Sequence, residues 1–204
     1  MSFGKSYSPY KKVVDAAVKY AEEKGVLLVH AAGNSYQDND KGGNFPNRTM
    51  LTDKSEVNNW LEIGASAFSN DSSFAAGFSN YGKKTVDIFA PGVNIFSTIP
   101  GNDYSNASGT SMASPATAGV AALVLSFSPK LEAKELREII ISTTNRFPGL
   151  KIFKARLGEV LFSELSIHGG TPNAYEAVKA VIGDTAVEEI EIPLRRSRLG
   201  RLFR

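Results

Sequence analysis

Apolar residues recur at helical spacing near the start of the chain. Between residues 9 and 24 they are three and four positions apart, at Val13, Val14, Ala17, Val18 and Ala21. This spacing predicts an amphipathic helix. Pro9 suits its first turn, and Gly25 suits its end.

Strand and helix patterns then alternate. A continuous apolar run at 26–32 predicts a strand buried on both faces. Further strands are predicted at 60–67, 86–90 and 94–99, and further helices at 110–127, 132–144 and 172–182. This alternation predicts parallel strand pairing and an α/β fold. Residues 35–49 are polar and predict a surface loop, whereas 150–170 are mixed and predict no particular element.

Composition narrows the class of protein. The chain has 204 residues, 42% hydrophobic and 22% charged, which is typical of one large globular domain or two small ones. A net charge of +2 gives no indication of a nucleic-acid partner, and the absence of cysteine excludes disulfides and thiolate metal sites. No run approaches the roughly 20 apolar residues of a membrane span. The opening "MSFGKSYSPY" has no signal-peptide pattern.

The last residues, 184–204, differ from the rest. They run from acidic to basic, with five arginines among the final ten residues. Such a charge run predicts a solvated arm. A role in binding an acidic surface or a partner stays open as the alternative.

A serine lies where the segment 105–125, "SNASGTSMASPATAGVAALVL", changes from loop to helix. A serine hydroxyl becomes a nucleophile only when a base removes its proton. The N–H groups of a helix N-terminus can stabilise the negative charge that then develops. Gly109 permits a close approach or an unusual φ next to Ser111. The alternative is simple helix capping by Ser108, Thr110 or Ser111. A nucleophile elbow is excluded, because Ala113 stands where that motif needs glycine.

An asparagine follows the first predicted strand, in "VLLVHAAGNS". Asn34 would lie at the carboxyl end of that strand, where open α/β sheets bind ligands. Its amide could face developing negative charge, as in an oxyanion hole. A turn asparagine is the alternative.

These two segments carry a family resemblance. "GTSMASPATAGVAAL" resembles the serine motif of subtilisin-like serine proteases (the subtilase family, peptidase family S8), and "AAGN" resembles the segment with the oxyanion-hole asparagine. Further similar segments follow the family order: "MSFG", "NFPN", "LEIGASA", "FSNYGKKTVDIFAPGVNIFST" and "GGTPNAYEAVKA". The likeness covers residues 1–183 and leaves 184–204 as a charged, arginine-rich tail. It implies a three-layer α/β fold with a mainly parallel sheet.

The resemblance also implies roles for residues. Ser111 would be the nucleophile of a serine endopeptidase, and the Asn34 side chain and the Ser111 N–H would form the oxyanion hole. The substrate-binding positions comprise the cleft strand, one wall of the pocket for the residue before the scissile bond, and the approach to the serine. They are Ser2, Phe3 and Gly4; Ala31, Ala32 and Gly33; and Gly109 and Thr110. The small wall residues would leave that pocket open to large apolar side chains.

Cofactors, partners and location follow from the same resemblance. No cofactor is required, and structural calcium is implied without an identifiable ligand set. A peptide or protein substrate is the expected partner, with no nucleic acid and no membrane span. A secreted, periplasmic or cell-surface location is expected, with no signal peptide in this chain.

The chain departs from the family pattern at the other two catalytic groups. The family's Asp-Thr/Ser-Gly and His-Gly-Thr-His motifs are absent, and the only histidines are His30 and His168. His30 is predicted to be a buried, neutral, hydrogen-bonded core histidine, and His168 a loop residue. We therefore expect the chain to be the carboxyl-terminal half of the catalytic domain, inactive alone, with the amino-terminal half as its partner. The alternative is a non-catalytic module that binds extended peptides.

Overall fold

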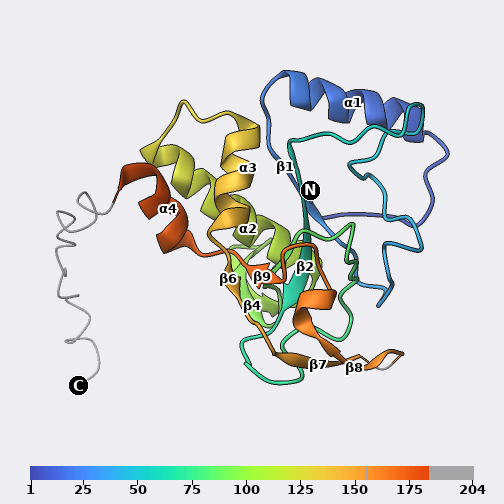
Figure 1. Ribbon diagram of the computed structural model, residues 1–204, viewed down its shortest axis with the longest axis vertical. Helices are drawn as coiled ribbons and strands as arrows, with labels where there is room; N and C mark the ends of the chain where they lie inside the picture. The colour runs from blue at the N-terminus through green and yellow to red at the C-terminus, as the bar shows by residue number, and fades with distance from the viewer. Residues whose placement is uncertain (155, 184–204) are drawn as a thin grey trace.

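The computed structural model describes residues 1–154 and 156–183 (Figure 1). Its helices are α1 (Lys11–Glu23), α2 (Thr110–Phe127), α3 (Ala133–Ser142) and α4 (Ala174–Ile182), with a short 3-10 helix, η1 (Phe162–Glu164). Its strands are β1 (Leu28–Ala31), β2 (Trp60–Ser66), β3 (Ile88–Pro91), β4 (Ile95–Ile99), β5 (Asp103–Ala107), β6 (Asn145–Arg146), β7 (Lys151–Lys154), β8 (Gly158–Leu161) and β9 (Gly170–Thr171). The arginine-rich tail, 184–204, lies outside the described residues.

A parallel sheet of three strands, in the order β1-β2-β3, forms the centre of the molecule. Both pairs are parallel, which confirms the pairing predicted from the strand-helix alternation. In register, His30 lies beside Glu62, and Ile63 lies beside Ile88. The periodic patterns thus give the central strands and all four α-helices close to their predicted places.

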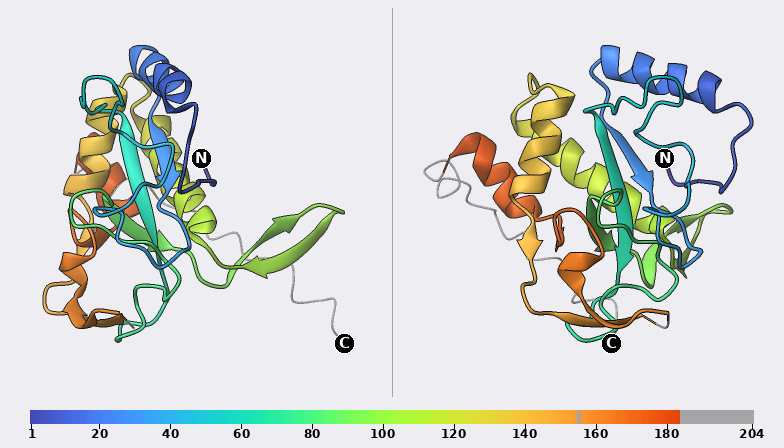
Figure 2. Two further views of the ribbon diagram at one scale, coloured as in Figure 1. Left: turned by 90° about the vertical axis from the view of Figure 1, so that its right-hand side faces the viewer. Right: turned by 45° about the vertical axis from the view of Figure 1, so that its right-hand side comes forward.

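The two faces of β2 contact different layers, because successive side chains of a strand point to opposite faces. Leu61, Ile63 and Ala65 join the largest apolar cluster, to which α2, α3 and α4 contribute. Trp60 points the other way and packs with Val18 of α1. The sheet therefore lies between α2, α3 and α4 on one side and α1 with its neighbouring loops on the other (Figures 1 and 2). This is the three-layer α/β arrangement expected from the resemblance.

A hairpin replaces the loop expected after residue 99. β4 pairs antiparallel with β5, and the two strands extend away from the rest of the molecule (Figure 2, left). Gly101 and Asn102 have φ values of 91° and 61°, so the turn uses residues that tolerate this region. The segment 105–107, expected to be loop, belongs to β5 because it pairs with β4, and nothing in the sequence indicates this pairing because β5 is largely exposed and carries no apolar alternation. Residues 150–170 likewise contain β7, β8 and η1, where no element was predicted.

The segment "MSFG" lies beside β1 but forms no regular strand among the described residues. Two main-chain bonds join it to β1, from Ala31 N to Met1 O at 3.0 Å and from the Met1 amino group to Val29 O at 2.5 Å. Ser2, Phe3 and Gly4 are exposed. The cleft strand implied by the resemblance is thus an extended, exposed segment here.

Among the described helices, α2 is the one with the length and apolar composition that could cross a membrane. A helix in the core of a globular domain has the same composition. α2 packs against β1, β2 and β3 and against α3 and α4, so it is the central helix of this fold.

Candidate active site

Ser111 lies in the first turn of α2. The helix begins after Gly109, and no side chain of its own segment caps it. Ser108, one of the predicted caps, accepts a hydrogen bond from Asn94 N instead. The simple capping hypothesis for this stretch is therefore wrong, and the Ser111 N–H has no acceptor among the described residues.

Asn34 is fixed to the same helix end. Its Oδ1 accepts hydrogen bonds from Thr110 N and Thr110 Oγ1, both at 2.9 Å, and Gly33 N donates to Thr110 Oγ1 at 3.2 Å. Because Oδ1 is used in this way, the donor Nδ2 of Asn34 faces away from Thr110. It has no acceptor among the described residues. Two unoccupied donors, Asn34 Nδ2 and Ser111 N, thus lie at one end of α2.

Gly109 leaves an open space between these two donors. A Cβ at Gly109 would lie 3.3 Å from Asn34 Nδ2 and 3.5 Å from Ser111 N. An oxygen atom near that point could accept from both. Gly109 has a φ of 161°, an extended conformation open to any residue. Of its two predicted roles, close approach is therefore the one that this geometry needs.

No base contacts the Ser111 hydroxyl in the described part of the chain. Ser111 Oγ donates to Ser2 O at 3.0 Å. His30 is buried as predicted, and its ring nitrogens contact Phe3 O at 2.7 Å and Glu62 Oε2 at 2.9 Å. His168 lies beside Asp87, and burial lowers its pKa. Neither histidine is placed to take a proton from Ser111.

A cleft of about 390 Å³ opens next to Ser111. Most of the predicted site residues line it: Phe3, Gly4, Ala31, Gly33, Asn34, Thr110 and Ser111. Three do not. Ala32 is fully buried in a core cluster, whereas Ser2 contributes its carbonyl to Ser111 and Gly109 lies between the two donors.

Polar side chains that the sequence did not single out form much of the remaining wall, notably Asn44 and Asn80. Asn80 uses its whole amide internally, for it accepts from Ser35 N and Gln37 N and donates to Ala32 O and Asn39 Oδ1. It is therefore a structural support of the wall.

Asn44 is different. Its Nδ2 donates to Ala31 O at 2.9 Å and to Glu62 Oε1 at 3.4 Å, whereas its Oδ1 faces Gly4, where a Cβ would overlap it. A carbonyl oxygen therefore borders the pocket that the sequence predicted to admit large apolar side chains. Asn44 lies in the polar loop 35–49, where nothing in the sequence marks one asparagine among several.

The expected calcium site has no cluster of charged ligands in the described part of the chain. No group of three or more acidic or histidine side chains within 1–154 and 156–183 is placed to hold a metal ion. The buried carboxylate Asp87 is already paired with Arg48 and Arg137. Calcium binding stays a prediction.

Comparison with known proteins finds serine proteases. The family model described as "Subtilase family" matches residues 1–183. A subtilisin-like serine protease of Rhodotorula mucilaginosa is 40% identical over 136 residues, 66% of this chain and 35% of that protein. An extracellular basic protease of Dichelobacter nodosus is 39% identical over 171 residues, 78% of this chain and 24% of that protein. The crystal structure of a cold-adapted subtilisin-like serine proteinase matches with a TM-score of 0.62 and 31% identity, covering 83% of this chain and 53% of that one. The chain spans about a third of the length of the curated relatives that it matches first.

Proposed function

Because this chain belongs to the subtilase family, we propose that it supplies the nucleophile and the oxyanion hole of a secreted serine endopeptidase. The observation that carries the proposal is the arrangement at the start of α2. The Ser111 hydroxyl lies beside two unoccupied donors, Asn34 Nδ2 and Ser111 N, that converge on the space left by Gly109. Two donors around one oxygen position are what acyl transfer requires.

The reaction follows from these positions. A base removes the Ser111 proton while Oγ bonds to the substrate carbonyl carbon, and the C=O electron pair moves to the oxygen. Asn34 Nδ2 and Ser111 N donate to that oxyanion. When the C=O re-forms, the C–N bond breaks and the leaving amine takes the proton from the base. Water then attacks the acyl-serine in the same way and releases the new carboxyl end.

The base comes from outside this chain in the proposed enzyme. Both histidines of the sequence are engaged elsewhere, His30 with Phe3 and Glu62 and His168 beside Asp87. We assign the base and its carboxylate to a second polypeptide segment with the family's Asp and His motifs. Exposed apolar side chains support such a partner: Leu123 and Phe127 on α2 are 43% and 45% exposed, and Phe96 on β4 is 67% exposed. Large apolar side chains exposed on two separate elements give a second segment surface to cover.

The test compares residues 1–204 with the Ser111→Ala variant on a chromogenic peptide, each with and without a separately made segment that carries the Asp and His motifs. We expect hydrolysis only from the wild-type chain with that segment, and covalent labelling by a serine-directed phosphonate to follow the same pattern. Ser111-dependent hydrolysis by the lone chain would show that its own residues supply a base. Hydrolysis that survives Ser111→Ala would remove Ser111 from the mechanism.

A non-catalytic, peptide-binding module is the second candidate. The observation that favours it is the hydrogen bond from Ser111 Oγ to Ser2 O, which leaves the hydroxyl protonated. Under this hypothesis the chain binds extended peptides with equal affinity before and after Ser111→Ala. The added segment then yields no hydrolysis.

A further inference from the structure

A polar pair lies inside the central sheet where apolar residues are the rule. His30 of β1 and Glu62 of β2 are register partners on the face toward α1, and they are 0% and 4% exposed. Their side chains meet at 2.9 Å, from His30 Nδ1 to Glu62 Oε2. Buried polar groups are tolerated where hydrogen bonds satisfy them, so the bonds of this pair determine what it holds in place.

Both ring nitrogens of His30 face oxygen acceptors. Nδ1 faces Glu62 Oε2, and Nε2 lies 2.7 Å from the carbonyl oxygen of Phe3. A carbonyl oxygen only accepts, so the Nε2–H donates to Phe3 O. His30 thus ties Phe3, in the cleft segment, to the carboxylate of Glu62.

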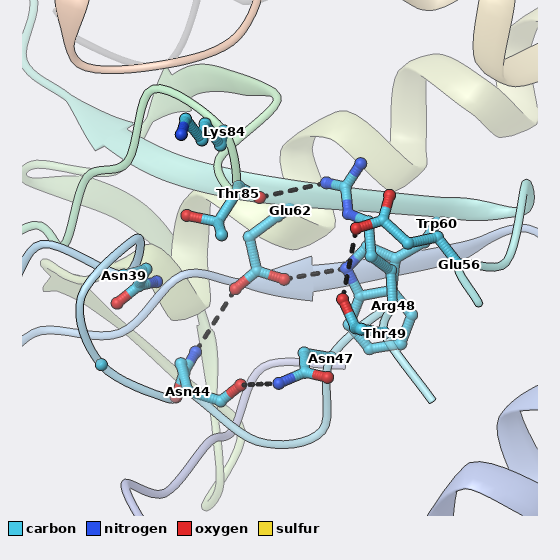
Figure 3. A pocket seen from close by; sticks show the side chains of 11 residues that line it. Asn39, Asn44, Asn47, Arg48, Thr49, Glu56, Trp60, Glu62, Lys84 and Thr85 are labelled. Carbon is cyan, nitrogen blue, oxygen red and sulfur yellow. Dashed lines mark hydrogen bonds between the residues drawn. The ribbon is translucent and has the colours of Figure 1, made fainter. Parts of the chain in front are cut away.

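The other oxygen of Glu62 reaches the opposite wall of the cleft. Glu62 Oε1 accepts from Asn44 Nδ2 at 3.4 Å, and Oε2 also accepts from the indole of Trp60 at 2.8 Å. Figure 3 shows Glu62 between Asn44 and Trp60, with a hydrogen bond to each. Because Ala31 O at 2.9 Å and the Glu62 carboxylate at 3.4 Å both accept from the amide nitrogen of Asn44, the amide oxygen is left on the side of Gly4 and the cleft.

We propose that Glu62 is a positioning residue that sets both walls of the substrate pocket, holding Phe3 through His30 and turning the acceptor oxygen of Asn44 toward the substrate. The inference rests on the proposed function, because it assigns the cleft to a peptide. It names the substrate class: the side chain before the scissile bond carries a hydrogen-bond donor, as glutamine does, and glutamate is disfavoured.

The variant Glu62→Gln removes this arrangement without a large change of size. An amide in place of the carboxylate has one donor end and one acceptor end. If its oxygen stays with Trp60, its NH₂ meets the Asn44 NH₂, and the Asn44 amide is left with Ala31 O as its one acceptor unless it turns its nitrogen toward the cleft. If its NH₂ lies toward Trp60 instead, it meets the indole N–H. Either placement sets two donors against each other. In the first one, a turn of the Asn44 amide exchanges the acceptor on the cleft side for a donor.

The experiment measures binding of two acetylated, amidated tetrapeptides to the full chain by calorimetry. The peptides differ only in having glutamine or glutamate at the position that enters the pocket. We expect the wild type to prefer glutamine, and Glu62→Gln to shift the ratio of the two dissociation constants about tenfold toward glutamate. A ratio that stays the same in Glu62→Gln overturns the inference but leaves the proposed function standing. A wild type that binds neither peptide, or that prefers glutamate, overturns the inference, whereas the proposed function is decided by the hydrolysis test with the added segment.

Two controls separate positioning from charge and from general destabilisation. In an Asn44→Ala background, Glu62→Gln should no longer change the ratio, and a shift that persists there means that the charge of Glu62 acts without Asn44, against the inference. Asp15→Asn is the matched control, because Asp15 is also a buried carboxylate, bonded to Lys11 and to Leu51 N away from the cleft. It should leave the ratio unchanged.

One measurement needs no variant. The ¹⁵N chemical shifts of His30 in the wild-type chain should show a hydrogen on Nε2, which the bond to Phe3 O requires. An Nε2 without hydrogen would overturn the link between Glu62 and the cleft segment, even if Glu62→Gln failed to fold.

Discussion

Lys154 should make the stability of this protein rise with pH in the alkaline range. Its side chain is fully buried in β7, and its ammonium group donates to Ala76 O at 3.1 Å and Ser79 O at 3.3 Å. It also lies 5.0 Å and 5.5 Å from the ring centres of Tyr36 and Tyr81. No carboxylate among the described residues pairs with it. Burial without a counter-ion lowers the pKa of Lys154 from 10.5 to about 8.

The sign follows from proton counting. Between pH 8 and 10.5 the unfolded chain binds more protons at this lysine than the folded chain, so the free energy of unfolding rises with pH. Below pH 8 the lysine is charged in both states and contributes no slope. With about 1.4 kcal/mol for each unit of pKa difference, the gain between pH 7 and pH 9.5 is about 2 kcal/mol.

The assay is urea unfolding of the wild type and Lys154→Met at both pH values. The free energy of unfolding of the wild type minus that of the variant should increase by about 2 kcal/mol from pH 7 to pH 9.5. Lys151→Met is the control from the same strand, because Lys151 is exposed and paired with Glu159, which raises its pKa. It should show no such gain. A difference for Lys154→Met that is flat or falls with pH would refute the account of a charged, desolvated amine.

Two further predictions concern the oxyanion hole in the enzyme reconstituted with the Asp and His segment. Gly109→Ala should leave the fold intact, because the extended φ of Gly109 suits alanine. It should lower kcat by at least about 10²–10³, because the new methyl group occupies the space between Asn34 Nδ2 and Ser111 N. An unchanged kcat would place the oxyanion elsewhere. Asn34→Leu should lower kcat by about 10²–10³ while phosphonate labelling of Ser111 persists. Asn34→Asp should lower kcat by at least the same factor, because it keeps an oxygen for Thr110 N but has no N–H donor for the oxyanion. Turnover retained in either Asn34 variant would remove Asn34 from the mechanism.

The periodicity of apolar residues predicted the helices and strands that bury one or both of their faces. α1 and α3 each bury one stripe, and β1 to β3 are mostly apolar segments buried between two layers. β5 and β8 were missed for the opposite reason. Both are antiparallel and largely exposed, and their pairing depends on the turn that precedes them, not on apolar alternation.

Some residues of the candidate site could be identified from the sequence, and others could not. Ser111 and Asn34 lie in motifs whose small residues and position at a helix start or strand end carry a chemical meaning, so the sequence could single them out. Asn44 could not be found in this way, because its role depends on a loop that returns to β1 and on a carboxylate of β2, 18 residues further along the chain. In the sequence, Glu62 is a single charged residue within an apolar segment, and nothing there indicates its partner. Only the pairing of β1 with β2 places it beside His30.

Successive side chains of β2 point to opposite faces of the sheet, so one strand contributes both to the apolar core and to the support of the cleft. Leu61 and Ile63 face α2 and belong to the main apolar cluster, whereas Trp60 and Glu62 face the other layer. A change on the first face removes apolar burial and acts on stability wherever the substrate lies. A change at Glu62 acts on the hydrogen bonds that reach Phe3 and Asn44, and so on the shape and polarity of the cleft. Glu62 is not among the residues that line the cleft, so under the proposal it acts on peptide binding only through Phe3 and Asn44, which are.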